Sequence, residues 1–217
     1  MSLTLYAHPF ASYCWKASIA LYENATPFTF HEIDLGDPAS AAELERLWPF
    51  KKFPVLTDGD TTVIESPIII EYLDLHYPGP ARLIPADAKA ALDIRFLDRF
   101  FDNYVQTPMQ AIVADTLYGT RNAAAVARWR SELDQAYAWL EQHITNRTWA
   151  AGDAFTLADC SAAPALFYAD WTHPIAESFP NVRAYRARLN ARPSVARTID
   201  EARPYRHFFP LGAPDRD

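Results

Sequence analysis

The segment from Lys52 to Pro67 constrains the fold of this chain more than any other stretch. Two short apolar runs, at residues 55–57 and 62–64, flank an Asp58-Gly59 pair. Such a pair tolerates the positive φ angles of a tight turn, so the pattern predicts an antiparallel hairpin. Ser66 and Pro67 then predict the N-cap and first residue of a helix, because a hydroxyl satisfies a free backbone N–H and proline has none to satisfy.

The same segment predicts a ligand position. A helix N-terminus presents unpaired N–H groups, and here it is preceded by the Glu65 carboxylate and carries the Ser66 hydroxyl. The arrangement offers one place for a ligand carboxylate and another for an ammonium group. Pro54 opens the first strand of the hairpin, where a residue without an N–H is tolerated and where a cis bond would direct the preceding backbone outward.

These residues carry a resemblance. Pro49 with the run from Lys52 to Leu56, then Ile64-Glu65-Ser66, then Ile70-x-Tyr72-Leu73, closely resembles the glutathione-binding half of cytosolic glutathione transferases. The resemblance implies a cis Pro54 and a Phe53 backbone that pairs with the cysteinyl part of glutathione. It also implies that Glu65 and Ser66 hold the γ-glutamyl end and that Lys52 lies near the glycine carboxylate.

The order of predicted elements fits that resemblance. Strands are expected at residues 3–7 and 29–33, with helices at 13–23 and 39–48, before the hairpin and the helix that follows it. The resulting βαβαββα order is that of a thioredoxin-like fold. Helix breakers at residues 79–85 predict a linker between a thioredoxin-like domain, residues 1–78, and an all-helical domain, residues 86–217.

The turn between the first strand and first helix should carry the chemistry. Thioredoxin-like redox proteins place a Cys-x-x-Cys here, but Ala11 occupies the first position, which excludes a dithiol cycle. Cys14 is expected to be a small buried apolar residue. Ser12 has two interpretations of equal weight: it donates to the glutathione sulfur and favours the thiolate, or it only caps the helix. Tyr13 is a second candidate donor, and Tyr6 should face the opposite side of the sheet.

Serine-type members of the family, including the zeta class, often carry a Ser-Ser-x-x-Trp-Arg-like sequence at this turn. Here Ala11 replaces the first serine and Lys16 the basic residue, so the transferase class stays open.

The second half predicts packed helices. Leu92, Phe96 and Phe100 repeat every four residues and are expected in the core, with a bend at Pro108. Thr156 and Asp159 form a capping-box pattern that resembles a signature of the transferases' helical domain. The resemblance implies a pocket for an electrophilic second substrate, with candidate residues Phe10, Tyr104, Ile112, Val113 and Tyr118. The aromatic segment 205–210 is expected to cover either that cleft or only the domain surface.

Composition narrows the classes of function. A net charge of −7 without a basic run argues against nucleic acid or an anionic membrane as a partner. The N-terminus lacks the pattern of a signal peptide, and no apolar run approaches the roughly 20 residues of a membrane helix. Two distant cysteines and six scattered histidines show no metal-ligand spacing, so no metal site is predicted. A cytoplasmic location fits best.

Three hypotheses follow. The leading one is a homodimeric, detoxifying glutathione transferase that uses glutathione as co-substrate and conjugates its thiolate to a hydrophobic electrophile. The second is a zeta-like isomerase that returns glutathione unchanged, which a basic pocket for a diacid would support. The third is a non-catalytic glutathione-binding or protein-interaction module, which Ala11 makes credible.

Overall fold

One mixed sheet forms the centre of the N-terminal half. The computed structural model describes residues 3–217. Met1 and Ser2, at the start of the segment examined for a signal peptide, lie outside the described residues. The strands are β1 (Leu3–Ala7), β2 (Thr29–Glu32), β3 (Val55–Asp58) and β4 (Thr61–Ile64), in the order β2-β1-β3-β4. β1 pairs with β2 in parallel, and β3 is antiparallel to both β1 and β4. The predicted hairpin is confirmed, with Gly59 at φ +57° in its turn.

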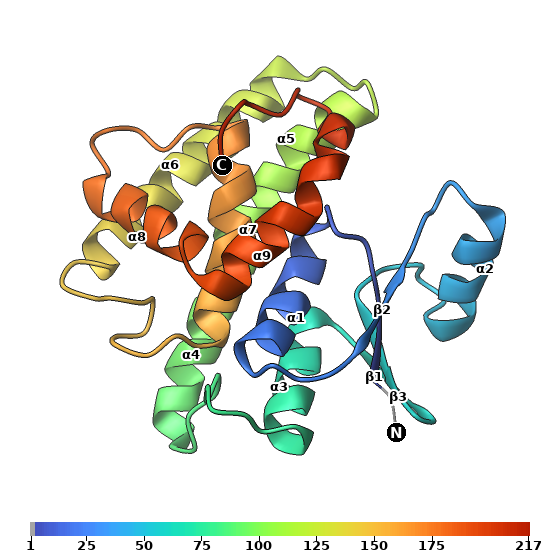
Figure 1. Ribbon diagram of the computed structural model, residues 1–217. Coiled ribbons are helices and arrows are strands. Elements are labelled where there is room, and N and C mark those ends of the chain that lie inside the picture. Colours follow the sequence, from blue (N-terminus) through green and yellow to red (C-terminus); the bar gives the residue numbers. More distant parts are fainter. Residues whose placement is uncertain (1–2) are drawn as a thin grey trace.

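Helices cover both faces of this sheet. Helices α1 (Ser12–Glu23) and α3 (Ser66–His76) lie on the face toward the helical half, and α2 (Pro38–Leu47) covers the opposite face (Figure 1). Tyr6 packs with Ile33, Leu44 and Val55 beneath α2, as the two-residue strand period predicts. The βαβαββα order and the thioredoxin-like fold are therefore confirmed.

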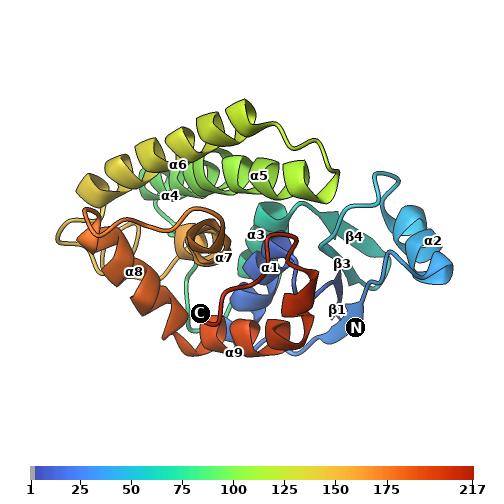
Figure 2. The same ribbon diagram turned by 90° about the horizontal axis from the view of Figure 1, so that it is seen from above.

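The C-terminal half is helical, as predicted. Its elements are α4 (Ala88–Phe100), the π-helical turn η1 (Phe101–Gln106), α5 (Thr107–Leu117), α6 (Ala123–His143), α7 (Leu157–Thr172), α8 (Pro180–Asn190), α9 (Pro193–Ala202) and the 3-10 turn η2 (Arg203–Phe208). Helix α7 is buried along its whole length and lies between the layer of α4, α5 and α6 and the layer of α8 and α9 (Figure 2). The predicted capping box of Thr156 and Asp159 fixes its start.

The stripe of Leu92, Phe96 and Phe100 predicted for the core is wrong for two of its three residues. The helical run that carries it is interrupted by η1, where the Thr107 N–H bonds to the Asp102 carbonyl five residues back, just before Pro108, the position at which a bend is expected. Leu92 and Phe96 are 65% and 53% exposed, although Phe100 is buried as expected. The buried face of α4 is instead formed by Ala91, Ile94 and Leu97 with Phe100, so most of the predicted stripe lies beside the core face.

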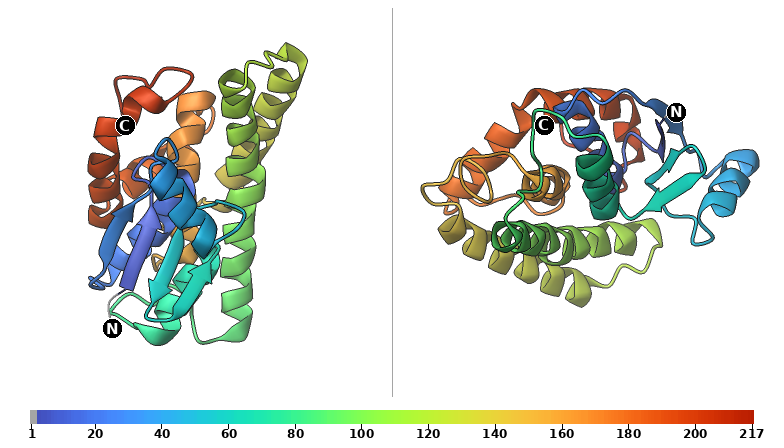
Figure 3. Two further views of the ribbon diagram at one scale, coloured as in Figure 1. Left: turned by 90° about the vertical axis from the view of Figure 1, so that its right-hand side faces the viewer. Right: turned by 90° about the horizontal axis from the view of Figure 1, so that it is seen from below.

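The two halves meet along α1, which contacts α7 and α9 as well as its own domain. Figure 3 shows the sheet and its helices lying against the long α4–α5 column. An ion cluster joins α1 to α4 and η1; it is formed by the buried Lys16, Asp98 and Asp102 and by the half-exposed Arg99. Lys16 Nζ lies 2.8 Å from Asp98 Oδ1 and 2.8 Å from Asp102 Oδ1, and its side chain is 1% exposed.

Arg99 completes the charge balance of the ion cluster. Its Nη2 lies 2.6 Å from Oδ2 of both aspartates, so two cations face two carboxylates. Burial alone would raise the pKa of Asp98, but Lys16, a Ser161 hydroxyl bond and Arg99 more than offset it and hold that pKa below its usual value. The cluster fixes the register of α1 against the helical half.

Candidate functional site

Two hollows adjoin at the start of α1. The polar hollow, of about 190 Å³, is lined by Tyr13, Trp48, Lys52, Phe53, Pro54, Glu65, Ser66, Pro67, Arg99, Asp102 and Asn103. The apolar hollow, of about 330 Å³, is lined by Phe10, Ala11, Ser12, Tyr13, Phe53, Met109, Gln110, Val113, Leu117, Tyr168, Phe208, Phe209 and Pro210. Tyr13 and Phe53 belong to both walls, so the two hollows are adjacent.

The polar hollow gathers every residue predicted to bind glutathione: Lys52, Phe53, Pro54, Glu65 and Ser66. The Phe53–Pro54 peptide bond is cis, as the resemblance implied. The hollow also contains Trp48 and, from the other domain, Arg99, Asp102 and Asn103, which sequence reasoning missed. Charges of both signs in one small hollow suit a ligand that carries carboxylates and an ammonium group.

The start of α3 differs from its prediction. Glu65, not Ser66, is the N-cap residue, and Ser66 and Pro67 are the first two helical residues. Glu65 has φ +68°, a left-handed conformation that costs a residue with a side chain about 1–3 kcal/mol and that clusters at functional sites. Neither a cap bond from the Glu65 side chain nor a hydrogen bond of the Ser66 hydroxyl is present among the described residues. Both groups are therefore left for a ligand.

The start of α1 also differs from its prediction by one residue. Ala11 is the N-cap residue and Ser12 the first helical residue, so the interpretation of Ser12 as the helix cap is wrong. Ser12 is 9% exposed, and its Oγ accepts a hydrogen bond from Gln106 Nε2 of the helical domain. Since the first N–H groups of a helix have no intrahelical acceptor, the hydroxyl and these N–H groups lie together at one end of α1.

Two further contacts shape the loop before α1. His8 Nδ1 accepts a hydrogen bond from the Phe10 N–H at 3.1 Å, and Tyr168 Oη donates to the Phe10 carbonyl at 2.9 Å. Burial lowers the pKa of His8, which keeps the ring neutral and Nδ1 able to accept.

Tyr13 faces both hollows as a neutral phenol. Burial, reinforced by the negative charge of Asp102, raises the pKa of Tyr13 to about 12. Its hydroxyl therefore stays protonated at neutral pH and can donate a hydrogen bond but cannot act as a base. Cys14, one residue further, is a buried free thiol whose pKa burial raises to about 12, so its prediction as a small buried residue is confirmed.

Only some of the residues predicted for the second-substrate pocket lie together in the structure. Phe10 and Val113 line the apolar hollow, but Ile112 lies in the core with 2% of its surface exposed. Tyr118 follows the end of α5 with 80% exposed and does not line this hollow. Helical spacing alone could not assign these faces, because η1 changes the register of α5.

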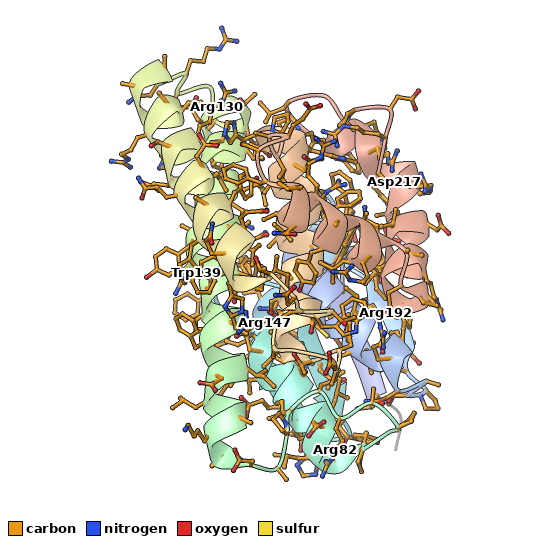
Figure 4. All side chains as sticks on the ribbon, turned by 90° about the vertical axis from the view of Figure 1, so that its left-hand side faces the viewer. Arg82, Arg130, Trp139, Arg147, Arg192 and Asp217 are labelled. Carbon is orange, nitrogen blue, oxygen red and sulfur yellow. The ribbon has the colours of Figure 1, made fainter. Side chains whose placement is uncertain are left out.

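Tyr104 lies elsewhere, in an open aromatic hollow of about 580 Å³ between α4–α5 and α6. That hollow is lined by Phe96, Phe100, Asn103, Tyr104, Pro108, Glu132, Gln135, Ala136 and Trp139. Figure 4 shows Trp139 at the outer margin of α6.

The aromatic C-terminal segment contributes Phe208, Phe209 and Pro210 to the apolar hollow, so it covers the cleft. Within residues 3–217, no group of three His, Cys, Asp or Glu side chains could hold a metal ion. No helix among those residues is long and apolar enough to span a membrane.

Comparison with known proteins identifies relatives of both halves. Residues 5–81 match the family model described as glutathione S-transferase, N-terminal domain, and residues 123–188 match glutathione S-transferase, C-terminal domain. Over 206 residues the chain is 31% identical to glutathione S-transferase 3 of Zea mays, covering 91% of this chain and 93% of that protein. It is 28% identical over 212 residues to a probable maleylacetoacetate isomerase of Vibrio cholerae, covering 94% and 98% respectively.

A solved structure of a glutathione S-transferase is also similar to this chain. The glutathione S-transferase of Methylobacterium radiotolerans, in complex with glutathione sulfonate, aligns with a TM-score of 0.78 at 29% identity. The alignment covers 92% of this chain and 95% of that one.

Proposed function

The chain belongs to the glutathione S-transferase family, and from this premise we propose that it conjugates the glutathione thiolate to a small hydrophobic electrophile. The observation that carries the proposal is that a polar, charged hollow and an apolar hollow share Tyr13 and Phe53 as walls, with Ser12 beside them in the wall of the apolar one. Holding both reactants there converts a bimolecular reaction into an effectively unimolecular one.

Glutathione would occupy the polar hollow in an extended form. The Phe53 backbone would pair with its cysteinyl part, and Lys52 would lie near its glycine carboxylate. The γ-glutamyl carboxylate would meet the N-terminus of α3 and the Ser66 hydroxyl, and the γ-glutamyl ammonium would meet Glu65. Arg99 and Asp102 border the same hollow, but they are already paired within the ion cluster.

Ser12 would stabilise the thiolate by donating its hydroxyl hydrogen to sulfur. Lowering a thiol pKa from about 8.5 by roughly two units requires about 2.7 kcal/mol. A charge-assisted hydrogen bond of roughly 1.5 to 3 kcal/mol and a helix dipole of roughly 0.3 to 1 kcal/mol are sufficient. The thiol proton leaves to solvent, and the thiolate then forms a bond to the electrophilic carbon while the bond to the leaving group, chloride in an aryl chloride, breaks and releases it as an anion.

The lining of the apolar hollow bears on the choice between transferase and isomerase. Among the described residues it contains no lysine, arginine or histidine. A diacid would need such a cation, whereas a hydrophobic electrophile gains from burial against Phe10, Val113 and Phe208. A zeta-like isomerase remains the second candidate, favoured by the similarity to the Vibrio cholerae protein.

We further propose that the protein is a homodimer in a reducing, cytoplasmic setting. Leu92, Phe96, Tyr104 and Trp139 are exposed apolar side chains, at 65%, 53%, 59% and 39%, and the last three line the open aromatic hollow. An exposed apolar surface beside a hollow is typical of a protein–protein interface. We propose that a second copy of this chain packs against it.

The test of the activity is Ser12→Ala, assayed with an activated aryl chloride. Turnover should fall roughly tenfold to a hundredfold, because about 1.4 to 2.8 kcal/mol of thiolate stabilisation is lost. Glutathione affinity should change little, and the pH at which the bound thiol ionises should rise. Superimposable curves of thiolate absorbance against pH would refute the role of Ser12. Bound glutathione that stays a thiol at neutral pH in the wild type would instead support the non-catalytic module.

A further inference from the structure

Gln106 belongs to no motif recognised in the sequence. Gln106 is the last residue of η1, is 2% exposed, and reaches across the domain boundary to donate from Nε2 to Ser12 Oγ. It lines neither the polar nor the apolar hollow. Gln106 therefore has no surface to offer a ligand directly, and any effect on the reaction must pass through Ser12.

The energetics of Gln106 favour a functional explanation for an amide at this position. Its Oε1 is buried without a hydrogen-bond partner. A buried unpaired carbonyl costs about 1–3 kcal/mol, a cost that a methionine of similar shape would avoid. A stability argument alone therefore disfavours glutamine here.

The register of the two domains makes the contact specific. Ser12 and Lys16 lie one turn apart on α1, and Gln106 and Asp102 lie four residues apart on η1. The Lys16–Asp102 ion pair and the Ser12–Gln106 hydrogen bond are thus consecutive bridges between the same two elements. The π-helical turn, a form frequent at functional sites, connects the two bridges on the side of the helical domain.

Resting on the proposed function, we propose that Gln106 is a positioning residue that orients the Ser12 hydroxyl so that its hydrogen points to the glutathione sulfur. A hydroxyl has one hydrogen and two acceptor lone pairs. The amide N–H occupies one lone pair of Ser12 Oγ and thereby leaves the hydrogen for the ligand. Donation into Oγ also polarises the O–H bond, because hydrogen bonds in a chain strengthen one another.

Three variants test this role by the ionisation of bound glutathione. Gln106→Met keeps the shape and removes the donor, so the pKa of the bound thiol should rise and turnover should fall about threefold to tenfold, the range that one net hydrogen bond supplies. Gln106→Glu presents a carboxylate that accepts the Ser12 hydrogen, so the thiol pKa should rise at least as far as in Ser12→Ala. Gln142→Met, at an exposed position on α6, is the matched control and should leave the curve unchanged.

The double variant Ser12→Ala/Gln106→Met separates positioning from other effects. If Gln106 acts through Ser12, the double variant should match Ser12→Ala alone in thiol pKa, since the orienting bond has no hydroxyl left to orient. The charges of Lys16, Asp98, Arg99 and Asp102 are the same in all variants, so they do not contribute to the comparison.

Each outcome is decisive. An ionisation curve unchanged in Gln106→Met, alongside a shift in Ser12→Ala, would overturn the role of Gln106 and leave the proposed function intact. A loss of stability without a shift in thiol pKa would do the same, because it is what a purely structural residue produces. Additive shifts in the double variant would also refute it. An unchanged curve in Ser12→Ala itself would instead refute the proposed activation by Ser12, and the inference with it.

Discussion

Replacing Lys16 with methionine should destabilise the whole protein far more than removal of an ordinary ion pair. Lys16 Nζ lies 2.8 Å from one oxygen of Asp98 and 2.8 Å from one of Asp102, and the three side chains are 1%, 3% and 8% exposed. Without it, Arg99, itself half exposed, must balance two buried carboxylates. Leaving a buried charge uncompensated costs about 3–5 kcal/mol, against a total stability of about 5–15 kcal/mol.

The control is an ion pair that joins the same two domains at the surface. Arg95 Nε of α4 lies 2.7 Å from Glu71 Oε1 of α3, with side chains 44% and 27% exposed. Arg95→Met should therefore cost about 1 kcal/mol, well below the loss in Lys16→Met, because this pair is bidentate but partly exposed to solvent. Urea unfolding followed by tryptophan fluorescence gives both values.

The comparison can fail in two ways. Equal losses in Lys16→Met and Arg95→Met would refute the argument from burial. If Lys16→Met does not fold, Lys16→Met/Asp102→Asn removes one of the orphaned charges and should recover part of the stability; no recovery would likewise contradict the electrostatic account.

Three other predictions follow from the site and the surface. Ser66→Ala and Glu65→Ala should weaken glutathione binding much more than they weaken folding, because their proposed partners are charged groups of the ligand. Isothermal titration measures the affinity and thermal melts measure the stability. A wild-type affinity in both variants would contradict the prediction. The chain should have the mass of a dimer by light scattering at micromolar concentration, and a monomeric mass would exclude the second copy proposed at the aromatic hollow. Because burial lowers the pKa of His8 from 6.5, the stability that its neutral ring contributes should be present above that pH and lost as pH falls through the folded value. His8→Gln should show a shallower loss between pH 7 and 5, and identical slopes would argue against it.

The order of elements was predictable because its signals are local. The Asp58-Gly59 turn, the strand period around Tyr6 and the pairing of Thr156 with Asp159 each depend on neighbours within a few residues. The helix starts were predicted one residue late. Ser66 looked like an N-cap, but Glu65 adopts φ +68° and takes that position, a conformation that propensity does not favour for glutamate.

The polar hollow was predictable only where one domain supplies it. Lys52 to Ser66 lie on one segment, so their gathering in the polar hollow follows from the hairpin alone. Arg99, Asp102 and Gln106 come from the other domain, and their approach depends on the crossing of η1 over α1, which no spacing in the sequence encodes. The same turn moved Tyr104 to a different hollow and Ile112 into the core.

The ion cluster restricts how such a chain can be recombined. Lys16 belongs to the N-terminal domain and both of its carboxylate partners belong to the C-terminal one. A hybrid that joins this N-terminal domain to a helical domain with apolar residues at those positions would bury a lysine without a counter-charge, and the reverse hybrid would bury two aspartates without Lys16. A domain exchange at the linker therefore keeps this charge balance only when the incoming domain carries matching charges, a cation in place of Lys16 or carboxylates in place of Asp98 and Asp102.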